Sequence, residues 1–311
     1  MVAARHRCKR RPPRRARGLP KIDHFLDPYV ITSGKHFRLK DHDPANVGKG
    51  RLTTESAAGL LQQGIERLAQ LQELLYADKR WSVLMIFQAM DAAGKDGTIK
   101  HVLSCMNPQG CHVSSFKSPS AEELGHDFLR RCAVKLPERG MIGIFNRSYY
   151  EEVLAVRVHP EFLGHQRLPK TLIGKHIWDE RHEDLRGFEQ HLARNGTIVR
   201  KFFLNVSKGE QKRRFLKRIE DPDRNWKFSA SDASERGHWD DYMAAYEQTI
   251  RATATPENPW LVVPADHKWF ARLVVVAALI KALENLDLSF PTVDEDSKKR
   301  LHDARRLLDN D

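Results

Sequence analysis

The chain has 311 residues, of which 41% are hydrophobic and 30% charged, with 52 Lys and Arg against 41 Asp and Glu. This length permits one large α/β domain or two small ones, with enough core to fold without disulfide or metal staples. The longest apolar run has only eight residues and the four cysteines include no C-x-x-C pair, which argues against a membrane span, a zinc module and a secreted scaffold. We therefore expect a cytoplasmic protein with no membrane partner.

The excess positive charge lies at the N-terminus. Residues 1–21 contain nine basic side chains and no acidic one, which leaves 43 basic against 41 acidic residues in the rest of the chain. Pro12, Pro13 and the near absence of large apolar residues predict a disordered basic arm there. It lacks the apolar segment of a secretory signal. An organellar transit peptide is one alternative, and a solvated tail that loosely attracts polyanions is the interpretation we favour.

The rest of the chain alternates between short apolar runs and helical patterns. Residues 22–52 predict an extended strap, and a helix should begin at Thr53 or Thr54 and end near Lys79. Apolar runs without alternation, typical of strands buried on both faces, follow at Ser82–Met90, His112–Phe116, Met141–Phe145, Thr197–Val206 and Trp260–Val263. Helical patterns lie at Thr98–Met106, Ala121–Val134, Lys170–Arg194, Ser207–Ile219, Glu235–Thr253 and His267–Leu286.

This alternation predicts an α/β fold in which helices cover both faces of a parallel five-stranded sheet. No internal repeat or low-complexity linker divides the chain between residues 50 and 290. We therefore expect a single domain over 53–290, followed by a polar C-terminal tail at 291–311.

A phosphate-binding loop is predicted directly after the first buried strand. Ala89–Thr98 reads A-M-D-A-A-G-K-D-G-T and leads into a helix, so small residues would let backbone N–H groups surround a phosphate at a helix N-terminus. Lys95 would reach the phosphate being transferred. The match to G-x-x-x-x-G-K-[ST] is imperfect at its first and last positions, and an ordinary turn between strand and helix is the alternative. The phosphate-binding residues of this loop are expected to be Ala92, Ala93, Gly94, Asp96, Gly97 and Thr98.

Magnesium ligation should differ from that of an ordinary phosphate loop. Asp96 stands where the hydroxyl ligand would be, and Asp91 is the expected replacement ligand, because a carboxylate among phosphates requires a cation between them. A turn-forming role is the alternative for Asp91. Asn146 ends the third strand, where such sheets place a metal-orienting polar residue. Because Asn146 is neutral, we expect Asp91 and Glu151 to hold Mg²⁺.

Two groups of cations are expected to neutralise phosphate. Arg147 follows Asn146, and Arg157 lies between apolar residues that suggest an inward position. A surface salt bridge is the alternative for Arg147, and a buried carboxylate partner is the alternative for Arg157. The second group lies at about 207–232, in a segment that resembles the mobile lid of a phosphotransferase. The alternative for this segment is a solvated basic helix face. Its cations are Lys212, Arg213, Arg214, Lys217, Arg218 and Lys227.

Five ordered blocks together resemble the polyphosphate kinase 2 family, and the resemblance extends from about Asp27 to Leu286. The blocks are Phe87–Val102, Asn107–Cys111, Phe145–His159, Asn225–Phe228 and Val263–Phe270. The resemblance implies a P-loop fold like that of thymidylate kinase with a helical lid. It also implies magnesium-dependent, reversible transfer of the terminal phosphate of inorganic polyphosphate to a nucleotide. It further implies that Asp91, Lys95, Asn146 and Arg147 are catalytic, and that the lid arginines face polyphosphate.

A glutamate at position 151 resembles the class III subgroup of that family, whose members accept both AMP and ADP. Whether guanine nucleotides are also accepted is left open. Family likeness also implies a homodimer or homotetramer. The nearest alternative is a nucleotide monophosphate kinase that uses ATP as donor, because it shares the sheet, the loop and the lid. A nucleic-acid-binding protein with a degenerate loop is a more distant alternative, and we expect no specific nucleic-acid partner.

Overall fold

The computed structural model describes residues 25–48, 52–104, 106–223, 225–227 and 234–309. The predicted basic arm at 1–21 and residues 224 and 228–232 of the predicted lid lie outside these described residues.

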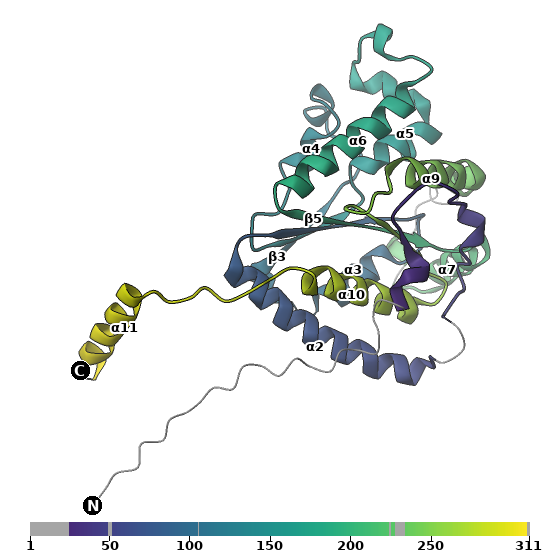
Figure 1. The fold of residues 1–311 in the computed structure, drawn as a ribbon. Helices are drawn as coiled ribbons and strands as arrows, with labels where there is room; N and C mark the ends of the chain where they lie inside the picture. Colours follow the sequence, from purple (N-terminus) through teal and green to yellow (C-terminus); the bar gives the residue numbers. More distant parts are fainter. Residues whose placement is uncertain (1–24, 49–51, 105, 224, 228–233, 310–311) are drawn as a thin grey trace, which may run out of the picture.

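A six-stranded sheet forms the centre of the molecule, in the order β1-β6-β5-β2-β4-β3 (Figure 1). The five predicted parallel strands are confirmed, as β2 (Ser82–Gln88), β3 (Cys111–Ser115), β4 (Ile142–Asn146), β5 (Thr197–Asn205) and β6 (Trp260–Pro264). The expected count of five strands was too low, because β1 (Val30–Ile31) of the strap pairs antiparallel with β6 at the sheet edge. A two-residue strand is too short to produce a recognisable apolar pattern.

Helices cover both faces of the sheet (Figure 1). One face carries α2 (Thr54–Asp78), α3 (Lys95–Leu103) and α10 (Lys268–Glu284). The other carries α4 (Arg130–Ala133), α5 (Ala155–Val158), α6 (Ile177–Arg194) and α9 (Trp239–Thr253). The predicted lid helix is α7 (Lys208–Glu220), which begins just after the carboxyl end of β5. Short 3-10 helices are η1 (Asp27–Tyr29), η2 (Leu39–Asp41), η3 (Pro108–Gly110), η4 (Glu123–Gly125), η5 (Tyr149–Val153), η6 (Pro160–Gln166), η7 (Lys170–Leu172), η8 (Asn225–Lys227) and η9 (Arg236–His238).

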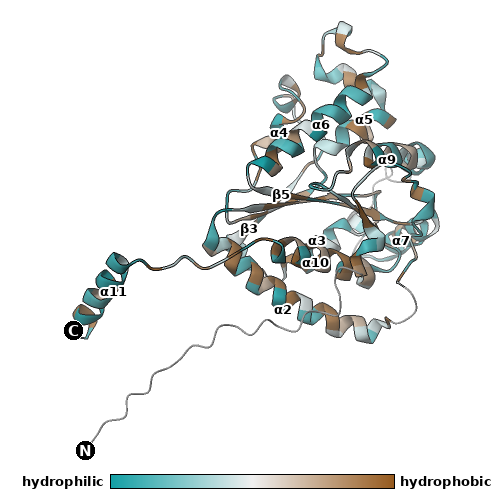
Figure 2. Cartoon of the chain, viewed as in Figure 1, coloured by the Kyte–Doolittle hydropathy of each residue, from teal (hydrophilic) through white to brown (hydrophobic). Residues whose placement is uncertain are grey.

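The hydrophobic core is formed mainly by the apolar strands of the sheet and one apolar helix. All seven residues of β2 are buried, as expected for a central strand covered on both faces. Twelve residues of α10 are buried, and this helix and the sheet are the brown, apolar centre of Figure 2. A Cβ atom on Gly64 of α2 would lie 2.9 Å from Val276 Cγ1 of α10, so glycine permits these two helices to approach closely.

Two predicted helices are shorter than their apolar patterns suggested. Ala121–Val134 forms only η4 and α4, because Asp127 Oδ1 accepts a hydrogen bond from Leu129 N at 2.9 Å in an Asx turn that interrupts the helix. Lys170–Arg194 forms η7 and then α6, with Gly174 between them. Apolar periodicity predicts that a helix is present, but turn-forming residues determine where the helix begins.

The C-terminal segment contains a helix that the sequence analysis did not predict. α11 (Glu295–Leu308) is capped by Asp294 Oδ1, which accepts a hydrogen bond from Ser297 N at 2.7 Å. It lies apart from the body of the molecule (Figure 1), and all of its residues are exposed or half-buried. None of the helices in the described part of the chain combines the length and apolar character that a bilayer span requires.

Candidate functional site

A cleft of about 1210 Å³ opens at the carboxyl ends of the parallel strands. In open α/β sheets, ligands bind at this edge where the strand order reverses, and β2 has that position between β4 and β5. Most of the predicted site residues line the cleft: Asp91, Ala92, Ala93, Gly94, Lys95, Asp96, Gly97, Thr98, Asn146, Arg147, Arg213, Arg214, Lys217 and Arg218. The structure therefore brings the predicted loop, the end of β4 and the lid helix together around one space.

The loop after β2 has the backbone of a phosphate-binding turn. Gly94, with φ +106°, precedes the first residue of α3, and Thr98 N donates to Gly94 O at 3.0 Å in the first turn of the helix. Ala92 adopts φ +60°, a left-handed conformation that is uncommon for a residue with a Cβ atom. The N-terminus of α3 consequently faces the cleft, where its N–H groups and partial positive charge favour an anion.

Lys95 lines the cleft and contacts the backbone of the loop. Its Nζ donates a hydrogen bond to Ala89 O at 2.7 Å. Burial lowers the pKa of Lys95, and the nearby Asp91 carboxylate opposes that effect. A partly desolvated ammonium group interacts strongly with an anion, because the local dielectric screens the pair less than water does.

Arg147 interacts with two carboxylates. Its Nη2 donates to Asp91 Oδ1 at 3.2 Å, and its backbone N donates to Phe87 O at 3.0 Å. Glu151, followed by Asp91, raises the pKa of Arg147 against the opposing effect of burial. Arg147 has φ +63°, a conformation that costs about 1–3 kcal/mol and is concentrated at functional sites. The guanidinium is therefore fixed beside Asp91 by backbone as well as side-chain contacts.

Asn146 and Asp96 meet across the loop. The register of β2 and β4 places Asn146 opposite Phe87, and Asn146 Nδ2 donates to Asp96 Oδ1 at 2.9 Å. Ordinary phosphate loops have a hydroxyl after the lysine and an acid on the neighbouring strand. Here the carboxylate is on the loop and the neutral amide is on the strand.

The acidic groups of the cleft fit a magnesium ion that takes most of its ligands from substrate and water. In the described ranges, no three His, Cys, Asp or Glu residues gather into a metal site. Asp91 and Asp96 both line the cleft, and Glu151 acts on the same arginine as Asp91. Mg²⁺ is commonly bound by one or two carboxylates together with phosphates and waters.

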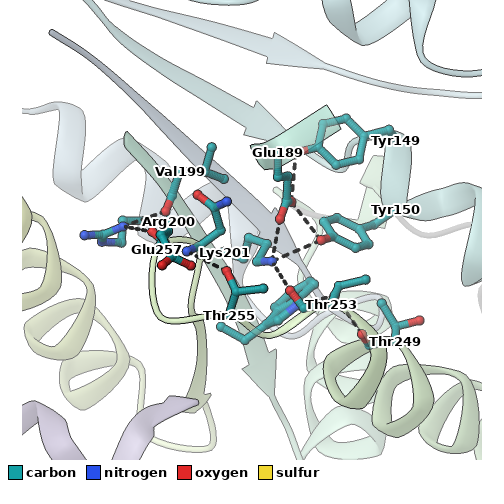
Figure 3. A network of polar contacts seen from close by, with 12 residues as sticks. Tyr149, Tyr150, Glu189, Val199, Arg200, Lys201, Thr249, Thr253, Thr255 and Glu257 are labelled. Atoms are coloured by element: carbon teal, nitrogen blue, oxygen red, sulfur yellow. Dashed lines mark hydrogen bonds and ion pairs between the residues drawn. The ribbon is translucent and has the colours of Figure 1, made fainter. Parts of the chain in front are cut away.

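A buried polar network holds the segment that follows Arg147 (Figure 3). The hydroxyl groups of Tyr149 and Tyr150 donate to Glu189 Oε1 of α6 at 3.0 and 2.7 Å. Lys201 Nζ of β5 donates to Glu189 Oε2 at 2.6 Å and to Thr253 O at 2.8 Å. The network ties η5 to β5, α6 and α9, and so fixes the chain that carries Arg147 and Glu151.

Comparison with known proteins identifies the family. The family model described as Polyphosphate kinase 2 matches residues 52–291. The chain belongs to this family. It is 51% identical over 282 residues to the ADP-polyphosphate phosphotransferase of Rhodopseudomonas palustris, covering 88% of this chain and 98% of that protein. It is 40% identical over 271 residues to the AMP/ADP-polyphosphate phosphotransferase of Meiothermus ruber, covering 87% and 97%.

A solved structure of the family has the same fold. The crystal structure of Polyphosphate Kinase 2 from Arthrobacter aurescens matches with a TM-score of 0.80 and 37% sequence identity, covering 91% of this chain and 98% of that one. The protein is therefore a phosphotransferase of the polyphosphate kinase 2 family with the predicted α/β architecture.

Some predicted site residues lie outside the cleft of this polyphosphate kinase 2 protein. Among the described residues, Glu151, Arg157 and Lys212 do not line it, and the side chain of Lys227 is not described. The guanidinium carbon of Arg157 lies 5.9 Å from the centre of the Trp178 ring. Burial lowers the pKa of Arg157, and Asp179 opposes this. The structure thus places Arg157 beside the start of α6.

Three cations of the cleft were not predicted from the sequence. Lys268 and Arg272, in the first two turns of α10, line the cleft together with Lys117, which follows β3. Arg272 Nε is buried and has no hydrogen-bond partner in the described residues. The signal was present, since Lys268 lies in the Val263–Phe270 block and residues four apart share a helix face.

Proposed function

We propose that this polyphosphate kinase 2 protein transfers the terminal phosphate of inorganic polyphosphate to AMP and ADP, reversibly and with Mg²⁺. The observation that carries this proposal is a cleft with Asp91, Lys95 and Arg147 at the loop and cations on two further walls. One wall is α7, with Arg213, Lys217 and Arg218, and the other is the start of α10.

Polyphosphate explains the distribution of charge better than ATP does. A flexible polyanion needs a row of cations and no groups that read a base edge, and the cleft walls supply such a row. An ATP-dependent nucleotide monophosphate kinase would need fewer cations beyond the loop. The family and the names of the relatives also support polyphosphate as the donor.

Both AMP and ADP are proposed as acceptors. The relative from Meiothermus ruber is named for both nucleotides, and the relative from Rhodopseudomonas palustris is named for ADP. Glu151 lies in η5 and acts electrostatically on Arg147, so it is suitably placed to influence which nucleotide phosphate approaches. A GDP-polyphosphate phosphotransferase from Mycobacterium tuberculosis is 31% identical, so guanine nucleotides belong in the test.

The proposed reaction is a direct in-line displacement. An oxygen of the acceptor phosphate forms a bond to the terminal phosphorus of polyphosphate, while the bond from that phosphorus to its bridging oxygen breaks. The shortened polyphosphate leaves with the electron pair, and no residue is covalently modified. Lys95 and Arg147 offset the charge that develops on the transferred group, and the loop orients it.

Mg²⁺, when bound, would neutralise phosphate charge, and we propose Asp91 and Glu151 as the residues that hold it. Asp91 Oδ1 contacts Arg147, while Asp91 Oδ2 makes no hydrogen bond to any described side chain or backbone group. We also propose a cytoplasmic homodimer or homotetramer, on the basis of family likeness.

The test is an assay of purified protein with Mg²⁺, polyphosphate and AMP, ADP, GMP or GDP in turn, followed by chromatography of the nucleotides. We expect ADP and ATP to form from AMP. If polyphosphate converts ADP to ATP but leaves AMP unchanged, polyphosphate remains the donor and the proposed acceptor range is overturned. Turnover only when ATP replaces polyphosphate would overturn the proposal and make the protein an ordinary nucleotide kinase.

A further inference from the structure

Arg214 was predicted to contact polyphosphate, but its guanidinium is fully occupied by the protein. Nε donates to Glu210 Oε1 at 2.6 Å. Nη1 donates to Ala92 O at 3.1 Å and to Ala93 O at 2.7 Å. Nη2 donates to Ala265 O at 2.6 Å and to Asp266 O at 3.0 Å. A guanidinium has five N–H donors, so these contacts leave none for a phosphate oxygen.

Gln211 makes the matching contact one turn earlier on the same face of α7. Its Nε2 donates to Asp91 O at 3.0 Å, and its Oε1 accepts from Arg236 Nη1 at 2.8 Å. Gln211 is 1% exposed and Arg214 is 8% exposed. Three successive loop carbonyls, those of residues 91–93, therefore accept hydrogen bonds from two buried side chains of α7.

These contacts determine how the loop presents its donors. In a trans peptide, the N–H of one residue points opposite to the C=O of the residue before it. Carbonyls of Asp91 and Ala93 that point toward α7 turn the N–H groups of Ala92 and Gly94 away from it, and both residues line the cleft. The same contacts stabilise the left-handed backbone of Ala92.

We propose that Arg214 and Gln211 are positioning residues that hold the phosphate loop in its binding conformation, and that neither contacts polyphosphate. This inference rests on the proposed function for its kinetic effect. It also divides α7 by role, because Arg213 and Lys217 line the cleft without a hydrogen bond to any described residue of the loop, and Arg213 pairs with Glu210.

The kinetic test compares Arg214→Lys with the wild type. Lysine keeps the charge but has three donors in place of the planar five. We expect kcat to fall about 100-fold, the cost of a small displacement of reacting groups, while KM for polyphosphate changes less than about threefold. A raised KM with kcat retained would show that Arg214 is a polyphosphate ligand and would overturn the proposal.

A second variant isolates the loop contact in case Arg214→Lys does not fold. Gln211→Glu keeps an acceptor for Arg236, and it replaces the donor to Asp91 O with a carboxylate oxygen whose negative charge lies beside Arg236. We expect a fall in kcat of about tenfold with an unchanged KM for polyphosphate, in line with one lost hydrogen bond to the loop. A wild-type kcat for Gln211→Glu would contradict the proposal.

Matched controls use the same substitutions outside the cleft. Arg251 has a glutamate four residues earlier, Glu247, as Arg214 has Glu210. Arg251→Lys and Gln70→Glu should leave kcat and both KM values unchanged. Equal losses in the controls would mean that the kinetic effect is not specific to the loop contacts.

Hydrogen exchange separates this inference from the proposed function. Without substrate, amide exchange in residues 92–98 should accelerate at least tenfold in Arg214→Lys and Gln211→Glu, and should stay unchanged in the controls. An inactive wild type would overturn the proposed function, while exchange would still test the positioning role. Unaltered exchange in both variants would overturn the positioning role whatever the activity.

Discussion

Two lysines, the half-buried Lys95 and the buried Lys201, differ in how many of their N–H donors the protein uses. Lys201 is 0% exposed and its Nζ donates to Glu189, Tyr150 and Thr253 O at 2.6–3.2 Å. Lys95 makes one hydrogen bond, to Ala89 O, within the described part of the chain, and it lines the cleft. Burial lowers the pKa of both lysines.

The difference separates a structural cation from a functional one. A buried cation whose N–H donors are all used stabilises one arrangement of the chain. Any other arrangement would leave a buried charge without its partner. A cation that lines a cleft and makes one backbone contact retains donors for a ligand. Arg214 shows that the distinction also applies within a cleft, since it lines the space and yet has no donor to spare.

Of the variants at the two lysines and the lid cations, Lys95→Met should have the largest effect on activity. We expect kcat to fall about 10²–10³-fold, as for other preorganised donors at a developing charge, with the free energy of unfolding nearly unchanged. Steady-state assays with polyphosphate and ADP, together with urea unfolding, measure both quantities. Lys100→Met, an exposed position on the same helix, is the control. Activity within threefold of wild type would remove the distinction between the two lysines.

Lys201→Met should have the opposite profile. It leaves Glu189 buried without its ammonium partner, so we expect the free energy of unfolding to fall by about 3–5 kcal/mol. Urea unfolding monitored by circular dichroism measures this change. The activity of the remaining folded protein should exceed that of Lys95→Met. Unchanged stability would show that the network in Figure 3 does not hold this part of the fold.

His182 extends the comparison to a buried neutral group. It is buried on α6, and its ring contacts Thr249 Oγ1 at 3.2 Å. Burial, followed by Arg157, lowers the pKa of His182 to about 4. Between about pH 6.5 and 4 the unfolded chain therefore binds a proton that the folded chain does not, and stability falls as the pH falls.

The expected loss over that pH range is about 3 kcal/mol at most. Urea unfolding at a series of pH values measures it. His182→Gln, which cannot titrate, should lose this part of the pH dependence. An equal slope in wild type and variant would assign the acid sensitivity to other groups.

The smallest effects are expected at the outer cations of the lid helix. Lys217→Ala and Arg218→Ala should each raise KM for polyphosphate by about two- to fivefold, because partly exposed ion pairs are weak. The effect should shrink at high salt, which screens exposed charges. Kinetics at low and high ionic strength measure it. A large fall in kcat with an unchanged KM would mean that these residues position the loop, as proposed for Arg214 and Gln211, and do not bind polyphosphate.

The sequence predicted what depends on local pattern. The five parallel strands, the loop from Ala89 to Thr98 and the helix that follows the fourth parallel strand all follow from short ordered segments. The start of α2 was predicted at Thr53 or Thr54, and the structure makes Thr53 the cap, since its Oγ1 accepts from Ser56 N at 3.2 Å. Family resemblance added the donor and the acceptor class.

The sequence did not predict what depends on tertiary contact. Arg213 and Arg214 look alike in the sequence, and only the approach of α7 to residues 91–93 distinguishes them. The cations of α10 lie about 170 residues beyond the loop, so their presence in the cleft depends on how the sheet is assembled. β1 has only two residues, too few for a recognisable apolar pattern.

The central claim, that the loop cleft carries out phosphate transfer from polyphosphate, is tested most directly with Asp91→Asn. Asparagine keeps the size and the backbone of the loop but removes the carboxylate that faces Arg147. We expect turnover of polyphosphate and ADP to be abolished, while thermal unfolding stays close to that of the wild type. Near-normal turnover by this folded variant would contradict the account.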